Sequence, residues 1–457
     1  MVNSFNTPED TQEMLEAIGI ESLADLFASV PADLRLNRPL DIPDELSEIE
    51  LTSHMTDLAS QNLHVANSAC FLGAGAYDHF VPAVVDAIAS RGEFFTSYTP
   101  YQPEVSQGNL QAMFEYQTMV CQLTGMDVSN ASVYEGGSAV AEAVLMSMSV
   151  TKRNKVVTSA SVHPQYREIL QTYFATLGTE LVVVDAPMGV INQEALAAAV
   201  DDKTACVLLQ HPNFFGCLED IHAAAELAHA HGALLVQSFD PISLGILKRP
   251  GDLGADIAVA EGQSLGTPLQ FGGPYLGILA CSEKFVRRLP GRIAGETRDR
   301  RGKRCFVLTL QTREQHIRRE KATSNICTNQ GLFALRAAIY LALLGKQGMR
   351  EVAELCLQKS HYALEQLTQS GRFEPAFQQP FFKEFAVRDL VNDVPGALAA
   401  CRADGIQAGI PLGTWFPNHD DCLLVAVTEK RTKDEIDRLA SHASTSHSSS
   451  QLDYATS

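Results

Sequence analysis

The chain has 457 residues, 46% of them hydrophobic, and a formal net charge of −19. This length exceeds what one small core needs, so one large and one smaller domain are expected. The negative charge argues against nucleic acid as a partner. No run of about 18 apolar residues occurs, which argues against a membrane span. The start, Met1–Asp10, is polar and unlike a signal peptide, so a cytoplasmic protein is expected.

The first 69 residues are expected to form an N-terminal arm. Thr7 is a candidate helix cap, Pro8 suits the first helical position, and Gly19 suits the end of the same helix. A second short helix is predicted near Ser22–Ala28, and prolines 31, 39 and 43 then favour an extended stretch.

Residues 70–328 alternate between short apolar runs and helical patterns, which is typical of an α/β domain with a mostly parallel sheet covered on both faces. The predicted strands are Lys155–Ser159, Leu181–Asp185, Ala205–Gln210, Leu234–Phe239, Asp256–Ala260 and Tyr275–Ala280. The predicted helices between them are Pro164–Leu177, Gln193–Val200 and Glu219–His231.

Residues 329–440 are expected to form a smaller α+β domain. Its predicted helices are Gly331–Leu344, Arg350–Gln366, Gly396–Asp404 and Lys433–Ala440, and its predicted strands are Phe382–Val387 and Leu423–Val427. The polar tail, residues 441–457, is rich in Ser, Thr and His and is predicted to be disordered.

The ten cysteines include no C-x-x-C pair and lie mostly in apolar runs, which favours reduced core thiols. No zinc-type spacing of Cys and His occurs, so no metal site is expected. The motifs of zinc peptidases and serine hydrolases are absent too.

A glycine turn, Gly136-Gly137-Ser138, precedes an apolar helix. Free backbone N–H groups at a helix start can hold a phosphate. An ordinary tight helix entry is the alternative, and the turn matches neither a Rossmann fingerprint nor a Walker loop.

Asp240 ends an apolar predicted strand, a position that points into the usual ligand crevice of an open α/β sheet. In enzymes that use pyridoxal 5'-phosphate (PLP), an Asp so placed pairs with the pyridinium nitrogen of the cofactor. The alternative is a capping Asp in a turn before Pro241.

A PLP enzyme of this architecture needs a lysine about one strand further on. The segment Ala260–Pro268 has none, Lys248 is too close to Asp240, and Lys284 lies beyond the Gly272-Gly273-Pro274 turn. The chain is therefore not expected to hold the cofactor covalently.

An aromatic, proline-stiffened loop spans Phe94–Glu104. Rigid tyrosines that carry hydroxyl groups are typical of interfaces and substrate pockets. A satellite hydrophobic cluster is the alternative.

The segment Arg287–Lys321 is a basic island, with twelve Lys and Arg against four acidic residues. It is either a solvated face held by salt bridges or a site for anions or an acidic partner.

Several blocks of the sequence resemble the P-protein family of the glycine cleavage system, in particular subunit 1 of two-subunit glycine dehydrogenase (decarboxylating). The resemblance covers residues 5–440. Its blocks are Phe71–Phe80 (FLGAGAYDHF), Arg91–Gly108, Pro212–Asp220, Gly272–Gly277, Pro290–Thr297, Leu308–Thr328 and Thr428–Thr432. One departure is the turn Glu135–Ala139, which reads EGGSA where the family has DGATA or similar.

The resemblance implies the PLP-dependent transferase fold (fold type I), with subunit 2 supplying the lysine that binds PLP. Anchored on Pro268 and the following glycines, the lysine position of the family falls on Gln263. Gly136, Gly137, Ser138, Asp240 and Gln263 would then form a relic cofactor pocket.

The implied reaction belongs to a complex, expected to be a dimer of heterodimers. Glycine loses its carboxylate as carbon dioxide, and the aminomethyl group passes to the lipoyl arm of H-protein. The Phe94–Glu104 loop would contribute to the active site of the partner, and the basic island would attract H-protein or hold the glycine carboxylate. The loop candidates are Tyr98, Thr99, Tyr101, Gln102 and Glu104, and the island candidates are Arg292, Arg298 and Arg318.

Two other functions remain open from the sequence. An autonomous PLP enzyme would show cofactor absorbance in the isolated chain. A non-catalytic scaffold would tolerate Tyr98→Phe and Tyr101→Phe without loss of kcat in the complex.

Overall fold

The computed structural model describes residues 6–322, 324, 326 and 330–445. They belong to two compact units, residues 1–63 and 64–457. The division of the second unit at residue 328 into a large and a small domain remains a prediction. No helix among the described residues is long and apolar enough to cross a membrane.

The first unit is helical. Helix α1 (Pro8–Ile18) begins at Thr7, whose side chain accepts a hydrogen bond from the Asp10 N–H, and ends at Gly19 with a left-handed φ of 83°. These caps are those predicted. The second predicted helix is a 3-10 turn, and α2 lies beyond the proline-rich stretch, where no helix was predicted. The remaining elements of this unit are η1 (Leu23–Phe27), η2 (Ala32–Leu34) and α2 (Glu48–Ser60).

The second unit is built on a seven-stranded sheet in the order β2-β8-β7-β6-β5-β3-β4. The five strands from β7 to β4 are parallel, whereas β8 is antiparallel to both of its neighbours. The mostly parallel sheet is confirmed, and each predicted strand is present within about two residues. The strands are β2 (Val128–Ser129), β3 (Lys155–Ser159), β4 (Glu180–Val184), β5 (Thr204–His211), β6 (Leu234–Phe239), β7 (Ile257–Glu261) and β8 (Gly277–Cys281).

Helices cover both faces of this sheet because its strands are apolar on both sides. In β5, Val207 and Leu209 pack into one core with α5, α8, α9 and α11. Cys206 and Leu208 point the other way and pack with α6 and α7. Helix α11 spans Gly331–Gln369, and the helices between residues 83 and 230 are α3 (Ala83–Ala89), α4 (Gly92–Phe95), α5 (Gln107–Thr124), α6 (Gly136–Thr151), α7 (Pro164–Phe174), α8 (Gln193–Ala199) and α9 (Ile221–Ala230).

The basic island contains an antiparallel hairpin that the sequence analysis did not predict. It is formed by β9 (Ile293–Arg298) and β10 (Arg304–Thr309). The short segment η5 (Glu283–Arg288) precedes the hairpin in the chain. Three more short helical segments follow it: η6 (Gln311–Arg313), α10 (Gln315–Arg318) and η7 (Arg319–Lys321).

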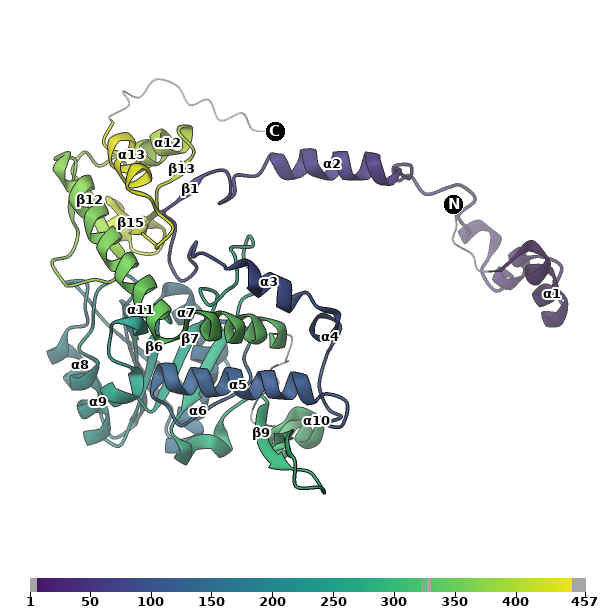
Figure 1. Cartoon of the computed structure of the whole chain (residues 1–457), viewed down its shortest axis with the longest axis horizontal. Coiled ribbons are helices and arrows are strands. Elements are labelled where there is room, and N and C mark those ends of the chain that lie inside the picture. The colour runs from purple at the N-terminus through teal and green to yellow at the C-terminus, as the bar shows by residue number, and fades with distance from the viewer. Residues whose placement is uncertain (1–5, 323, 325, 327–329, 446–457) are drawn as a thin grey trace. The chain divides into compact units, whose positions relative to one another are not determined.

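Helix α11 (Gly331–Gln369) leads from the large sheet to a smaller one (Figure 1). It breaks at Gly345, with φ 57° and ψ −166°, where the sequence predicted two helices. The small sheet has the order β11-β12-β15-β14. Its core also takes in β1 and β13, which pair in parallel. The remaining elements are β1 (Ala69–Cys70), β11 (Phe373–Pro375), β12 (Glu384–Asp389), α12 (Val394–Ala403), β13 (Ile406–Gln407), β14 (Ile410–Pro411), β15 (Cys422–Ala426) and α13 (Lys433–Ala443).

The cysteines and the C-terminal residues differ in how well the structure matches the prediction. The nine cysteines among the described residues are free thiols, and seven of them are buried. The predicted disorder from residue 441 is wrong for residues 441–443, because Ile436, Leu439 and Ala443 form one buried face of α13. Residues 446–457 lie outside the described part of the chain.

A buried carboxyl group on α6 makes stability depend on pH. Burial raises the pKa of Glu142 to about 7 from 4.5, although the Ser324 hydroxyl donates a hydrogen bond to it. The unfolded carboxyl ionises at lower pH than the folded one, so the free energy of unfolding falls as pH rises from 4.5 to 7. Glu142→Gln keeps an acceptor for Ser324 and should raise stability at pH 8 by up to about 3 kcal/mol.

Urea unfolding at pH 5 and pH 8 measures this effect. Glu142→Gln should approach the wild type at pH 5, where much less of the ionisation cost is present. Glu180→Gln, at an exposed position on β4, is the matched control and should change stability little at either pH. An equal gain for Glu142→Gln at both pH values would contradict the assigned cause.

Candidate functional site

A polar site lies at the carboxyl ends of β6 and β7, where open α/β sheets commonly bind ligands. Asp240 directly follows β6, and Glu261 is the last residue of β7. Segments around Tyr77 and Lys383, far away in the sequence, help to enclose the same space. The remaining cavity has a volume of about 40 Å³, which leaves room for a few water molecules.

Asp240 is engaged by a lysine of its own chain. Its Oδ2 lies 2.6 Å from the Nζ of Lys383, and its Oδ1 accepts a hydrogen bond from the Ile242 N–H. Lys383 is 1% exposed, and its Nζ lies 3.7 Å from the centre of the Tyr77 ring. The ammonium group of Lys383 is therefore the partner of Asp240, the residue predicted to pair with a pyridinium nitrogen.

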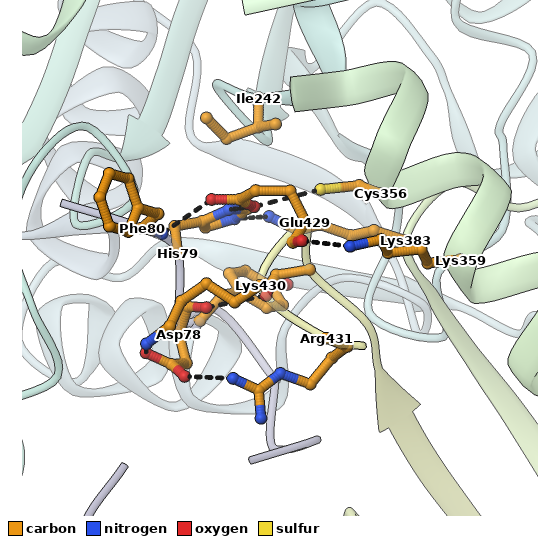
Figure 2. A network of polar contacts seen from close by, with 12 residues as sticks. Asp78, His79, Phe80, Ile242, Cys356, Lys359, Lys383, Glu429, Lys430 and Arg431 are labelled. Atoms are coloured by element: carbon orange, nitrogen blue, oxygen red, sulfur yellow. Dashed lines mark hydrogen bonds and ion pairs between the residues drawn. The ribbon is translucent and has the colours of Figure 1, made fainter. Parts of the chain in front are cut away.

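The same lysine belongs to a longer polar network (Figure 2). The Nζ of Lys383 is 2.9 Å from His79 Nε2, and His79 Nδ1 is 2.6 Å from a carboxylate oxygen of Glu429. The other oxygen of Glu429 accepts a hydrogen bond from the Phe80 N–H. Next to it, Asp78 pairs with Lys430 and Arg431. These contacts fasten residues 78–80 to the turn after β15.

His79, Cys356 and Glu429 have ligand atoms within 4.8 Å of one another, a grouping that sequence spacing cannot reveal. Nevertheless, the buried ammonium group of Lys383 beside His79 would repel a metal cation. Hydrogen bonds and ion pairs account for the arrangement.

Gln263 is buried and hydrogen-bonded at both ends of its amide. Its Oε1 accepts from the Tyr77 N–H at 2.9 Å, and its Nε2 donates to the carbonyl oxygens of Tyr77 and Thr267. The side chain thus joins two backbone segments at the position where the resemblance places a lysine. An amide cannot form the covalent link that PLP enzymes use.

The backbone N–H groups of the glycine turn are taken by carboxylates. Glu135 accepts from the N–H groups of Gly137 and Ser138 and from the Ser138 hydroxyl. Glu261 accepts from the Gly136 N–H at 2.9 Å and from two further backbone N–H groups. Burial raises the pKa of Glu261 to about 8. Two acidic side chains thus occupy the backbone N–H groups that a phosphate would need.

Of the five residues predicted for the relic pocket, Asp240 lines the cavity, whereas Gly136, Gly137, Ser138 and Gln263 are not among its lining residues. The contacts of all five do not fit PLP. Carboxylates use the N–H groups of the turn, an ammonium group faces Asp240, and an amide replaces the lysine. Glu384 adds a further buried carboxyl, which accepts from the Ala74 N–H and the Tyr77 hydroxyl. Burial raises the pKa of Glu384 to about 7. No step of a PLP reaction can be assigned to this chain's own pocket.

The tyrosine loop forms a separate surface. Tyr98 is 73% exposed and Tyr101 is 50% exposed, and Gln102 and Glu104 are exposed too, whereas Thr99 is half-buried. None of these five residues lines the cavity beside Asp240. Tyr98 instead lines a cavity of about 190 Å³ with apolar side chains of the loop, α5 and α11, including Phe94, Phe95, Met113, Leu332 and Leu335.

The three arginines predicted in the basic island do not converge. Arg292 donates to the Tyr101 hydroxyl at 2.8 Å, and its guanidinium lies 5.3 Å from the centre of that ring. Arg298, near the tip of the β9–β10 hairpin, donates to the Gly302 carbonyl oxygen. Arg318 lines a third cavity. Arg292 therefore belongs with the tyrosine loop.

Sequence reasoning missed Lys383, His79 and Glu384 at the site beside Asp240. Lys383 lies 143 positions after its partner Asp240, and no local pattern links them. The one available signal was the pair Lys383-Glu384 at the start of an apolar strand, where charged residues are uncommon. His211 is buried as well, and its Nδ1 accepts a hydrogen bond from the Glu219 N–H.

The sheet order, the helices on both faces and the site at the strand ends define the class of protein, the PLP-dependent transferase fold. A sphingosine-1-phosphate lyase from Burkholderia pseudomallei has this fold, with a TM-score of 0.65 at 16% identity over 91% of this chain and 93% of that one. At such low identity, the likeness concerns the fold alone.

The model of the family "Glycine cleavage system P-protein" matches residues 5–442. The chain therefore belongs to the glycine cleavage system P-protein family. It is 52% identical over 436 residues to a "Probable glycine dehydrogenase (decarboxylating) subunit 1" from Desulforamulus reducens. That match covers 95% of this chain and 97% of the relative. The relative of the same name from Geotalea uraniireducens is 53% identical over 435 residues, with the same shares.

A solved structure agrees with this assignment. The crystal structure of a glycine decarboxylase (P-protein) of the glycine cleavage system, in inhibitor-bound form, superposes with a TM-score of 0.88 at 44% identity. The match covers 97% of this chain and 99% of that chain. The family resemblance and the predicted fold class are confirmed.

Proposed function

We propose that this chain is the subunit of a two-subunit glycine decarboxylase that does not hold the cofactor. A second subunit binds PLP covalently, and the complex releases carbon dioxide from glycine and passes the aminomethyl group to the lipoyl arm of H-protein. The proposal rests mainly on the site beside Asp240, which the chain's own side chains occupy. Lys383 pairs with Asp240, and Gln263 stands where the family resemblance places the lysine that binds PLP. The names of the relatives as subunit 1 support the same division of labour.

Within this complex, the chain's own contribution is positional. The tyrosine loop presents two large aromatic side chains to solvent, and aromatic residues of this kind are enriched at interfaces. Arg292 holds Tyr101 in place by a hydrogen bond and by a cation–π contact. In the proposed complex, Tyr98 and Tyr101 enter the active site of the partner, with Thr99, Gln102 and Glu104 beside them.

The cations of the basic island would attract an acidic carrier protein to the complex. Arg298 is exposed on the β9–β10 hairpin, and Arg318 is exposed beside α10. Interactions of exposed charges are screened by salt. The KM for the carrier should therefore rise with ionic strength, and a variant with Gln at positions 292, 298 and 318 should lose most of that dependence.

Co-expression with subunit 2 and an assay of glycine–bicarbonate exchange test the proposal. Exchange is expected with the two chains together and not with this chain alone. The isolated chain should also lack an aldimine absorbance band that borohydride abolishes. Exchange activity or such a band in this chain alone would overturn the proposal in favour of an autonomous PLP enzyme.

A further inference from the structure

The charges of the basic island fall into two groups with different surroundings. On the β9–β10 hairpin, three cations have acidic or backbone partners: Arg304 pairs with Glu296 at 2.9 Å, Arg301 lies 3.6 Å from Asp299, and Arg298 donates to the Gly302 carbonyl oxygen. The second group gathers in a cavity outside the hairpin. Its members are Arg287, Arg288, Arg313, Arg318 and Lys321.

The cavity has a volume of about 340 Å³ and is walled by cations from four short segments, η5, η6, α10 and η7. Leu310 and Thr312 complete the lining, so no carboxylate is among the described lining residues. Within the described part of the chain, Arg287, Arg288, Arg318 and Lys321 form no ion pair. Arg313 lies 3.7 Å from a carboxylate oxygen of Glu314.

Arg313 lines this cavity with a side chain that hydrogen bonds hold in place. Its side chain is 8% exposed, and it donates hydrogen bonds to the carbonyl oxygens of Leu310 and Gly291. Leu310 itself has a left-handed φ of 52°, which turns the chain at this point. A buried guanidinium fixed by backbone oxygens is already oriented and loses little freedom when it binds an anion.

We infer that this cavity binds a compact oxyanion with two or more negative charges, of the class of phosphate and pyrophosphate groups. Guanidinium groups present forked N–H donors that match phosphate oxygens. Five cations held close together repel one another, and a multiply charged anion would relieve this repulsion. A compact anion can enter the cavity and approach Arg313, whereas a protein surface would contact mainly the exposed cations at its rim.

Isothermal titration calorimetry of the full-length chain with inorganic phosphate and pyrophosphate, at about 0.1 M salt, tests the inference. Saturable binding at one site is expected, tighter for pyrophosphate. The variant Arg288→Gln/Arg318→Gln should bind pyrophosphate at least tenfold more weakly. The control Arg300→Gln/Lys303→Gln removes the same charge from the exposed hairpin and should bind within about twofold of the wild type.

Three outcomes would overturn the inference. The first is the absence of saturable binding of either anion to the wild type. The second is an equal loss in both double variants, which would indicate non-specific attraction by the island. The third is binding of polyglutamate, but not of pyrophosphate, through Arg288 and Arg318, which would indicate docking of an acidic protein. Each variant should keep the thermal stability of the wild type, because the substituted side chains are exposed.

Discussion

Replacing Tyr98 with phenylalanine should lower kcat of the two-subunit complex by roughly ten- to hundredfold. The side chain is 73% exposed in this chain, so the loss of its hydroxyl should leave the fold unchanged. In the proposed complex, that hydroxyl helps to position the reacting groups of the partner's active site. Glycine–bicarbonate exchange by the co-purified complex measures the effect.

The control for this variant is Tyr173→Phe, which removes a hydroxyl from an exposed tyrosine of α7. It should leave kcat unchanged. Tyr101→Phe should resemble Tyr98→Phe, but it also removes the acceptor of the Arg292 hydrogen bond and is therefore less specific. If both loop variants assemble with the partner and keep the wild-type kcat, the chain is a scaffold and the proposed role of the loop is wrong.

Replacing Lys383 with methionine should destabilise the isolated chain by about 3–5 kcal/mol. Lys383 is buried, and its removal leaves the carboxylate of Asp240 without its cation. Asp240→Asn should also destabilise, because Lys383 then faces His79 and Tyr77 without a negative partner. The double variant should lose less stability than the sum of the two single variants, since neither charge then remains unpaired.

Urea unfolding at pH 7 measures these effects. Lys433→Met is the matched control, because it removes a lysine from an exposed ion pair with Asp437 and should change stability little. Additive losses in the double variant would show that Lys383 and Asp240 do not act as a pair. None of the variants should gain cofactor absorbance, because Glu135 and Glu261 still occupy the N–H groups of the glycine turn.

The local features of this chain follow from its sequence. Alternating apolar strands and helical patterns predict the parallel sheet, and strands such as Lys155–Ser159 and Leu234–Phe239 begin and end as predicted. The cap at Thr7 and the missing lysine near Gln263 are also readable from sequence, since each depends on residues close together in the chain. The family resemblance over residues 5–440 adds the function proposed for the chain.

The tertiary structure alone decided what fills the relic pocket. Lys383 reaches Asp240 because the segment before β12 pairs with the segment after β5, through Phe381 and Cys217 and through Phe382 and Gly216. No sequence periodicity encodes that contact. The different surroundings of the basic-island arginines also depend on the tertiary structure. Arg292, Arg298 and Arg318 are close in sequence, but a hairpin separates them into three environments. Sequence fixes which residue types are available, whereas long-range packing determines which charges meet, and the strength of their interaction depends on that distance.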